Sequence, residues 1–181
     1  MHTTYIIFFF IIIFPRIVFI LFFPELGGDY EIYTTVAKNI LNGCGVSLSD
    51  PLIDECVAHF GGNHGPGYPL FISLGWTIFN YSDNAVRIMQ TIVYSFSCLY
   101  LMRSIYLLTN NKKPMIIIGL VLAFSPLLLA WPRYLQTETL SLAAVIYLIA
   151  ELLISLNIRK IKIIPIGIAL IFATWIRLDN I

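Results

Sequence analysis

Charged side chains are scarce in this chain. Only 12% of its 181 residues are Asp, Glu, Lys or Arg, whereas 59% are hydrophobic and the mean hydropathy is +0.85. A soluble domain of this length cannot bury so much apolar surface. The formal net charge is only +1, so the total charge gives no basis for binding nucleic acid. The composition predicts an all-α membrane protein, a polytopic bundle of transmembrane helices.

The amino terminus lacks the features of a cleaved signal peptide. Residues 1–4 carry no Lys or Arg, and no small-x-small cleavage site follows Phe23. The apolar run 5–23 is therefore expected to stay as a membrane anchor. Further windows long enough to cross about 30 Å of hydrocarbon complete a set of about five expected spans. They are 85–108, 115–131, 139–156 and a last one that begins near residue 163.

The distribution of charge predicts the orientation in the membrane. Lys and Arg concentrate in the short connections 109–114 and 157–163, as is typical of cytoplasmic loops. The long connection 24–84 instead carries seven acidic residues and one basic residue, Lys38. We therefore expect a cytoplasmic amino terminus, an external loop over 24–84, and a multi-pass protein of the plasma or inner cell membrane.

The external loop is expected to carry two interfacial helices. Apolar side chains recur at helical spacing over 33–41, Lys38 and Asn39 lie on the opposite face, and Asn42-Gly43 supplies a stop signal. This pattern predicts an amphipathic helix on the membrane surface. Farther along, the apolar stretch 70–79 is too short to span, which predicts a second interfacial or re-entrant helix.

Cysteine is also rare. Cys44 and Cys56 share the external loop, where an oxidising compartment permits a disulfide, although free thiols are an equally open alternative. Cys98 falls within a predicted span and is expected to serve packing. Arg16, beside Pro15 in the first span, is expected to face the bundle because a lipid-facing arginine costs a few kcal/mol.

Several short motifs follow one another along the chain. They are Gly28-Asp29-Tyr30-Glu31-Ile32-Tyr33, Gly65-Pro66-Gly67-Tyr68-Pro69-Leu70-Phe71, Ala85-Val86-Arg87-Ile88-Met89-Gln90, Ser125-Pro126 and Thr137-Glu138-Thr139-Leu140. In order and spacing they resemble the amino-terminal part of the polytopic C-type glycosyltransferases, of the dolichyl-phosphate-mannose protein mannosyltransferase type and its bacterial relatives in glycosyltransferase family 39. The resemblance implies transfer of a sugar from a polyprenyl-phosphate carrier to a protein or glycolipid acceptor on the outer face of the membrane.

The resemblance assigns the catalytic base to Asp29, with Glu31 as the second catalytic candidate. Relatives commonly place Asp and Glu side by side, whereas Tyr30 separates them here. The chemistry agrees independently, because an acceptor hydroxyl must lose its proton as it attacks the sugar, and a carboxylate can take it. The alternative is that Asp29 only caps the helix that begins at Tyr30.

The carrier phosphate calls for cations. Arg177 and Arg133 are the available guanidiniums, and their planar fork suits phosphate. A frequent Arg-Pro pair of the family appears here as Arg177-Leu178. Arg133 could instead only snorkel at the membrane interface. Glu138 could instead only stabilise the helix dipole, with Thr137 as the helix cap. The remaining substrate-binding candidates are Glu138, His64 and Tyr68.

No metal or other cofactor is expected, although a divalent ion stays open. His59 and His64 lie near Asp54 and Glu55 without the spacing of a metal site. Two other classes of function stay open: a transport or assembly protein such as a lipid-linked-sugar flippase subunit, and an inactive truncated remnant. Transporters tend to show repeated halves with ionisable groups at the midplane. The acids here gather in one external loop and no repeat is visible, which favours the enzyme. Residues 1–181 are expected to form one transmembrane domain, the amino-terminal fragment of a longer chain.

Overall fold

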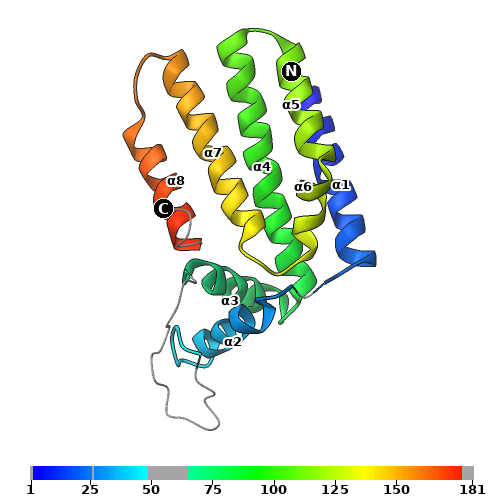
Figure 1. The fold of residues 1–181 in the computed structure, drawn as a ribbon, viewed down its shortest axis with the longest axis vertical. Helices are drawn as coiled ribbons and strands as arrows, with labels where there is room; N and C mark the ends of the chain where they lie inside the picture. Colours follow the sequence, from blue (N-terminus) through cyan, green and yellow to red (C-terminus); the bar gives the residue numbers. More distant parts are fainter. Residues whose placement is uncertain (1, 26, 49–64, 177–181) are drawn as a thin grey trace.

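Every regular element in the described part of the chain is a helix. The computed structural model describes residues 2–25, 27–48 and 65–176 (Figure 1). Its longer helices are α1 (His2–Phe22), α4 (Asp83–Thr109), α5 (Lys112–Phe124), α7 (Glu138–Asn157) and α8 (Ile163–Ile176). The shorter ones are α2 (Tyr30–Leu41), α3 (Gly67–Phe79), α6 (Pro126–Ala130) and the 3-10 helix η1 (Trp131–Arg133). The predicted all-α membrane bundle is confirmed.

The long helices run side by side, with α4 at the centre. α4 contacts α1, α5 and α7, and α8 packs on the other side of α7. α2 and α3 lie across one end of this bundle, which we call the α2–α3 end (Figure 1). The α4–α5 and α7–α8 connections and the amino terminus lie at the opposite end. The basic connections and the acidic loop are thus separated by the length of the bundle, as the sequence predicts.

Three helices are long and apolar enough to cross a membrane, namely α1, α4 and α7. A fourth span results if α5 is counted together with α6 and η1, which continue it after a bend of 55°. α8 is also an apolar helix, but with 14 residues in the described part of the chain it is shorter than α1, α4 and α7. Each span expected from the sequence therefore coincides with helical structure in the described residues, but the expected span 115–131 is broken rather than straight.

The outer surface of the bundle suits hydrocarbon. Phe10 and Phe14 on α1 and Ile164 and Ile171 on α8 expose between 61% and 76% of their surface. Exposing apolar area to water costs about 25 cal/mol per Å². Lipid removes this cost, which explains how so apolar an exterior is compatible with a stable fold.

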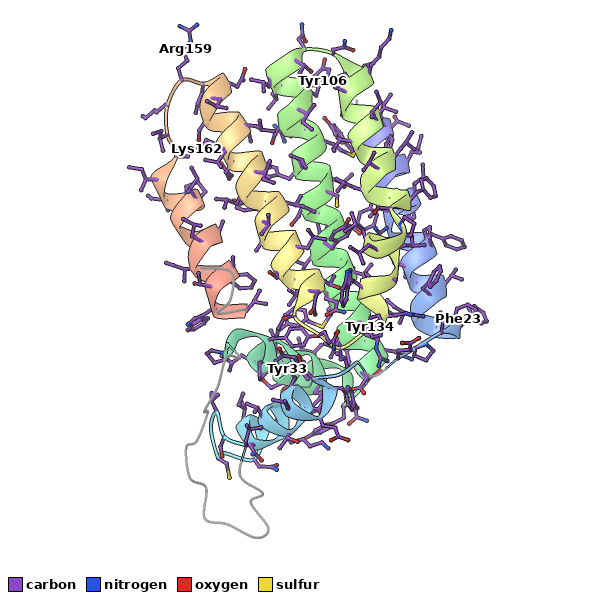
Figure 2. The ribbon with its side chains drawn as sticks, in the orientation of Figure 1. Phe23, Tyr33, Tyr106, Tyr134, Arg159 and Lys162 are labelled. Atoms are coloured by element: carbon purple, nitrogen blue, oxygen red, sulfur yellow. The ribbon has the colours of Figure 1, made fainter. Side chains whose placement is uncertain are left out.

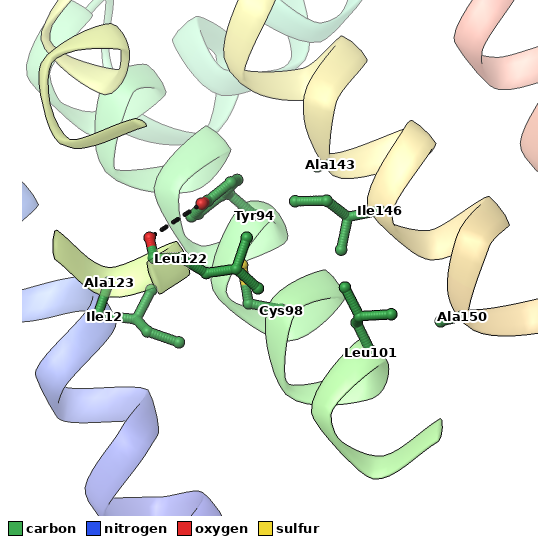
Figure 3. Close-up of a cluster of buried hydrophobic side chains, with 9 residues drawn as sticks. All are labelled: Ile12, Tyr94, Cys98, Leu101, Leu122, Ala123, Ala143, Ile146 and Ala150. Atoms are coloured by element: carbon green, nitrogen blue, oxygen red, sulfur yellow. Dashed lines mark hydrogen bonds between the residues drawn. The ribbon is translucent and has the colours of Figure 1, made fainter. Parts of the chain in front are cut away.

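The centre of the bundle is a cluster of side chains from α1, α4, α5 and α7 (Figure 3). Small residues on α7, such as Ala143 and Ala150, let that helix approach α4 closely. Tyr94 of α4 reaches across the cluster, and its hydroxyl donates to the carbonyl oxygen of Leu122 at 3.2 Å. Cys98 is buried in the same cluster as a free thiol, as predicted for a packing residue.

Arg16 is fully buried within α1, which confirms that it faces the bundle. Its guanidinium lies over the ring of Tyr94, 4.7 Å from the centroid. Within the described residues it forms no ion pair with a carboxylate. A buried cation requires other electron-rich partners. Besides the ring of Tyr94, these are the carbonyl oxygen of Ile12 in α1 and two carbonyl oxygens of α5.

The break between α5 and α6 supplies the two partners from α5. Arg16 donates through Nη2 to the carbonyl oxygen of Leu122 at 2.7 Å and through Nη1 to that of Ala123 at 3.4 Å. Both carbonyls belong to the last turn of α5, where helical donors run out, and Pro126 has no N–H to offer. Arg16 therefore replaces the donors lost at the bend and sits at the negative end of the α5 dipole.

α2 spans Tyr30 to Leu41, as the sequence predicts, and packs on α3. Tyr33 and Val36 face inward and Lys38 is exposed. The placement of Asn39 on the polar face was wrong, because its side chain is 1% exposed. Its Nδ2 donates to the carbonyl oxygen of Ser47 at 2.8 Å, since the chain after α2 folds back over this side.

α3 begins at Gly67, earlier than the predicted start at residue 70. The preceding turn packs against the end of α8. A Cβ added at Gly65 or Gly67 would lie 2.1 Å or 2.8 Å from the carbonyl oxygen of Trp175. Only glycine permits this approach of two backbones, so the Gly-Pro-Gly sequence lets α3 start directly beneath α8.

Cys44 takes part in a disulfide. The sequence left a disulfide and a free thiol open for Cys44, and the structure favours the disulfide. Cys56, the predicted partner, lies outside the described residues.

Candidate functional site

The candidate site lies at the α2–α3 end, where the link from α1 to α2 rests on the segment 131–137. The backbone N–H of Glu25 donates to the carbonyl oxygen of Arg133 at 3.5 Å, and their side chains form an ion pair at 3.0 Å. Gly27 adopts a φ of +81° and lies directly against Gln136. These contacts bring the acidic start of α2 next to the connection between η1 and α7 (Figure 2).

Asp29 occupies the N-cap position of α2, with φ −100° and ψ 11°. Its backbone carbonyl accepts the N–H of Tyr33 at 3.1 Å, but its side chain forms no capping hydrogen bond. The carboxylate is half-buried, and Glu31 lies in the first turn of the same helix with its side chain exposed. Asp29 thus starts the helix through its backbone, and its carboxylate does no capping. The catalytic roles of both residues stay predictions.

Arg133 ends η1 and makes three polar contacts. Besides its ion pair with Glu25, its Nη2 donates to the hydroxyl of Tyr134 at 2.7 Å, and its guanidinium stacks on that ring. The side chains of Arg133 and Glu25 are 22% and 50% exposed. Ion pairs of this exposure contribute about 0–1 kcal/mol, so an anionic ligand can displace the glutamate at little cost.

Glu138 lies in the first turn of α7, as predicted. Thr137 occupies the N-cap position, but its side chain forms no capping hydrogen bond, so the predicted cap by that side chain was wrong. Glu138 lines a cavity of about 250 Å³ whose other walls are mainly apolar side chains of α6, η1 and α7. A carboxylate in an apolar cavity beside η1 is a reasonable contact for a sugar hydroxyl, and this binding role stays a prediction.

Tyr68 is fully buried in α3. Its hydroxyl donates to Oε1 of Gln90 at 3.0 Å, and its ring meets that of Tyr33 edge to face, with centroids 5.0 Å apart. Burial raises the pKa of Tyr68 well above its ordinary value, so the hydroxyl keeps its proton. In this conformation Tyr68 supports the wall of the site from inside, and substrate contact by its side chain stays a prediction. His64 and Arg177 lie outside the described residues.

Asp83 joins α2, α3 and α4, a role that sequence reasoning missed. Its Oδ2 accepts the hydroxyl of Tyr30 at 2.7 Å and its Oδ1 accepts Nε1 of Trp76 at 2.9 Å. Burial and the hydrogen bond to Asp83 raise the pKa of Tyr30 to about 12, so Tyr30 remains a donor at all physiological pH values. The local sequence indicates only that Ser82 caps α4. It does not indicate that Asp83 binds Tyr30 and Trp76.

Arg87 and Gln90, one turn apart on α4, were also missed. Arg87 is 4% exposed and donates to Oδ1 of Asn84 at 2.7 Å and to the carbonyl oxygen of Glu25 at 3.2 Å. Gln90 donates through Nε2 to the carbonyl oxygens of Pro132 and Tyr134. Both lie in the motif 85–90, which could have marked them. Together they fix the α1–α2 link and the segment 131–137 to α4.

We expect Asp83→Ala to detach α2 from the bundle. The change removes two charge-assisted hydrogen bonds worth about 1.5–3 kcal/mol each in comparable settings. Limited proteolysis of the detergent-solubilised protein should show faster cleavage near α2, and the melting temperature should fall. Asp83→Asn, which keeps acceptor capacity at one oxygen, should lose less. Equal protection of α2 in the wild type and Asp83→Ala would contradict the assignment.

No group of three or more His, Cys, Asp or Glu side chains suited to a metal ion occurs in the ranges that the structure describes. The polar groups of the site are instead carboxylates, guanidiniums and a carboxamide. Such a set can take a proton, bind an anion and orient hydroxyl groups.

A sequence model of the family "Dolichyl-phosphate-mannose-protein mannosyltransferase" matches residues 63–177, more than half of the chain. The chain belongs to this family. The match confirms the resemblance seen in the sequence and agrees with a membrane-embedded helical glycosyltransferase. It covers α3 to α8 with Arg133 and Glu138, and it begins after Asp29 and Glu31. No significant match was found among curated proteins or solved structures.

Proposed function

We propose that this mannosyltransferase-family chain moves a sugar from a polyprenyl-phosphate carrier to a protein or glycolipid acceptor on the outer face of the membrane. The observation that carries the proposal is the position of Asp29. Its carboxylate forms no cap hydrogen bond, is partly accessible, and belongs to a segment that rests on the connection bearing Arg133. Family membership supports the reaction class.

The proposed step needs one base and a set of cations. The acceptor hydroxyl gives its proton to the Asp29 carboxylate while its oxygen bonds to the anomeric carbon of the sugar. The bond from that carbon to the carrier phosphate oxygen breaks, and the phosphate leaves with the electron pair. A phosphate already carries charge, so it needs guanidiniums rather than a general acid.

Arg133 is one guanidinium within the described part of the chain that can serve the phosphate. Among the described residues, its guanidinium is held by the ion pair with the half-exposed Glu25 and by Tyr134. Exchanging that glutamate for a phosphate replaces a weak ion pair with a doubly donated hydrogen bond. Arg177 is the second proposed cation.

The proposal is tested with the full-length protein in proteoliposomes. Polyprenyl-phosphate sugars carrying a radiolabel are offered together with peptide and glycolipid acceptors, and nucleotide sugars serve as control donors. Transfer from at least one lipid carrier and from no nucleotide sugar is the expected outcome. Transfer from a nucleotide sugar, or from no carrier at all, would refute the proposed donor class.

The orientation gives a prediction of its own. Lys38 on α2 and Lys113 on α5 are exposed at opposite ends of the bundle. In a protein whose free Cys98 is replaced by Ala, we expect Lys38→Cys to react with a membrane-impermeant thiol reagent in intact cells. Lys113→Cys should react only after the membrane is permeabilised. The reverse pattern would invert the topology and place α2 in the cytoplasm.

The proposed phosphate role of Arg177 predicts a binding defect. Arg177→Ala should weaken carrier binding by about 1.5–3 kcal/mol, through loss of charge-assisted hydrogen bonds. In steady-state transfer assays this appears as a higher KM for the carrier with a smaller change in kcat. Arg177→Lys keeps the charge and should lose less than Arg177→Ala. An unchanged KM in both variants would remove Arg177 from the carrier site.

A further inference from the structure

A second site lies at the end of the bundle opposite α2 and α3. There a cavity of about 450 Å³ opens between α1 and α4, a volume within the usual range for ligand pockets. Figure 2 labels Tyr106, one of its lining residues, close to the α4–α5 connection. The lining residues are Tyr5, Phe96, Leu99, Tyr100, Arg103, Tyr106 and Leu107. We call this cavity the α1–α4 groove.

Two donors that line the α1–α4 groove, Arg103 and the hydroxyl of Tyr5, lack a carboxylate partner within the described residues. Arg103 is exposed, and within the described residues it forms neither an ion pair nor a hydrogen bond with a carboxylate. The hydroxyl of Tyr5 is buried and has no hydrogen-bond partner among those residues. Arg103 is close enough to both Tyr5 and Tyr100 to interact with them electrostatically. A guanidinium and a phenol that share a groove in this way suit an anionic oxygen ligand.

The depth of these donors matches the level of lipid headgroups. Arg103 precedes the end of α4 at Thr109 by roughly 9 Å, at 1.5 Å per residue. Tyr5 lies in the first turn of α1. Tyrosine and arginine are typical of the boundary between hydrocarbon and headgroups, where a cationic head reaches towards phosphate.

Charge at this end favours an anionic lipid over a zwitterionic one. Lys112 and Lys113 begin α5, and Arg159 and Lys162 lie in the α7–α8 connection of the same end (Figure 2). The one carboxylate that the structure describes nearby, Glu151, is buried, accepts the hydroxyl of Tyr100 at 2.6 Å and lies 3.8 Å from the Nζ of Lys162. Among the described residues, the charged side chains at this end are therefore mainly basic.

The rest of the groove is apolar. Phe96, Leu99 and Leu107 lie on the same face of α4 as Arg103, at separations of seven, four and four residues from it along the helix. Phe96 is 60% exposed and packs against Phe9 of α1. Phe96 and Leu99 form a wall that leads from the guanidinium towards the middle of the bundle, which is the path an acyl chain follows.

We propose that the α1–α4 groove binds one anionic phospholipid, with its phosphate on Arg103 and the hydroxyl of Tyr5 and an acyl chain along Phe96 and Leu99. The site is separate from the proposed sugar-transfer site and does not depend on transferase activity. The lipid fills the groove between α1 and α4 and completes the hydrogen bonds of both polar groups.

The test uses the purified full-length protein, titrated in detergent with phosphatidylglycerol, with phosphatidylcholine and with polyprenyl phosphate. Native mass spectrometry counts the bound molecules. We expect one saturable phosphatidylglycerol site with an affinity about ten-fold or more above that for phosphatidylcholine. Arg103→Gln should weaken phosphatidylglycerol binding by about ten-fold, as expected for loss of a charge-assisted hydrogen bond.

Two further variants distinguish a defined binding site from non-specific attraction by the basic residues at this end. Lys113→Gln removes a cation from the same end outside the groove lining and should leave the affinity within two-fold. Leu107→Trp fills the groove without a change of charge and should reduce binding as much as Arg103→Gln does. The proposal is overturned by an unaffected Arg103→Gln protein, by an equal loss in Lys113→Gln, or by tighter binding of polyprenyl phosphate in the groove.

Discussion

Asp29→Asn is expected to lower the rate of sugar transfer by about 10² to 10⁴, the usual contribution of a general base. Asparagine keeps the size of the side chain but cannot accept the proton of the acceptor hydroxyl. The fold should tolerate the change, because the Asp29 side chain makes no capping hydrogen bond. Single-turnover transfer from a radiolabelled lipid carrier in proteoliposomes measures the effect on the chemical step.

Glu31 provides the matched control for Asp29. It lies two residues later in the first turn of α2 and is exposed, so Glu31→Gln makes the same chemical change at a neighbouring carboxylate. We expect a smaller loss for Glu31→Gln, and unchanged carrier affinity for Asp29→Asn. Normal transfer by a stable Asp29→Asn protein would leave Asp29 as the residue that starts α2. A larger loss at Glu31 would reassign the base.

Arg16→Leu is expected to lower the stability of the bundle. It leaves the carbonyl oxygen of Ala123 buried without this donor and that of Leu122 with only the hydroxyl of Tyr94. An unsatisfied buried acceptor costs about 1–3 kcal/mol, and we expect a loss of about this size. Unfolding in mixed detergent micelles, followed by circular dichroism, should show the change in the free energy of unfolding.

Arg103→Leu is the control for Arg16, because it removes an exposed arginine from another span. Its effect on the free energy of unfolding should stay within about 0.5 kcal/mol. Arg16→Leu should also weaken carrier binding, since the bend that Arg16 stabilises leads the chain into η1 and Arg133. Equal stability of the Arg16→Leu and wild-type proteins would show that the bend holds without this arginine.

The positions of the helices follow from local signals. The apolar windows are long enough to cross a membrane, and short polar residues mark where helices begin. The Oγ of Ser82 accepts the N–H of Ala85 at 3.3 Å, and Oδ1 of Asn111 accepts that of Lys113 at 2.9 Å. The amphipathic pattern after Tyr30 likewise predicts α2 from its own residues. Such signals need no distant partner, which is why they could be read from the sequence.

The connections within the candidate site depended on the tertiary structure. Tyr30 and Asp83 are 53 residues apart in sequence, and Arg16 and Leu122 are 106 apart. Helical periodicity alone predicts that Asn39 lies on the polar side of α2. It is buried instead, because the chain folds back over it at Ser47. No periodicity encodes which distant group will satisfy a polar side chain.

The sequence by itself determined the membrane class, the approximate positions and order of the helical segments, the family and the acidic character of the α2–α3 end. Apolar length, cap residues and ordered motifs are properties of contiguous residues, so a single chain displays them. The tertiary structure decided that α5 breaks at a bend held by Arg16, that Arg87 and Gln90 anchor the site, and that the Asp29 carboxylate is not used as a cap. These outcomes follow from the rule that every buried polar group must find a partner, and the packing of distant helices chooses that partner.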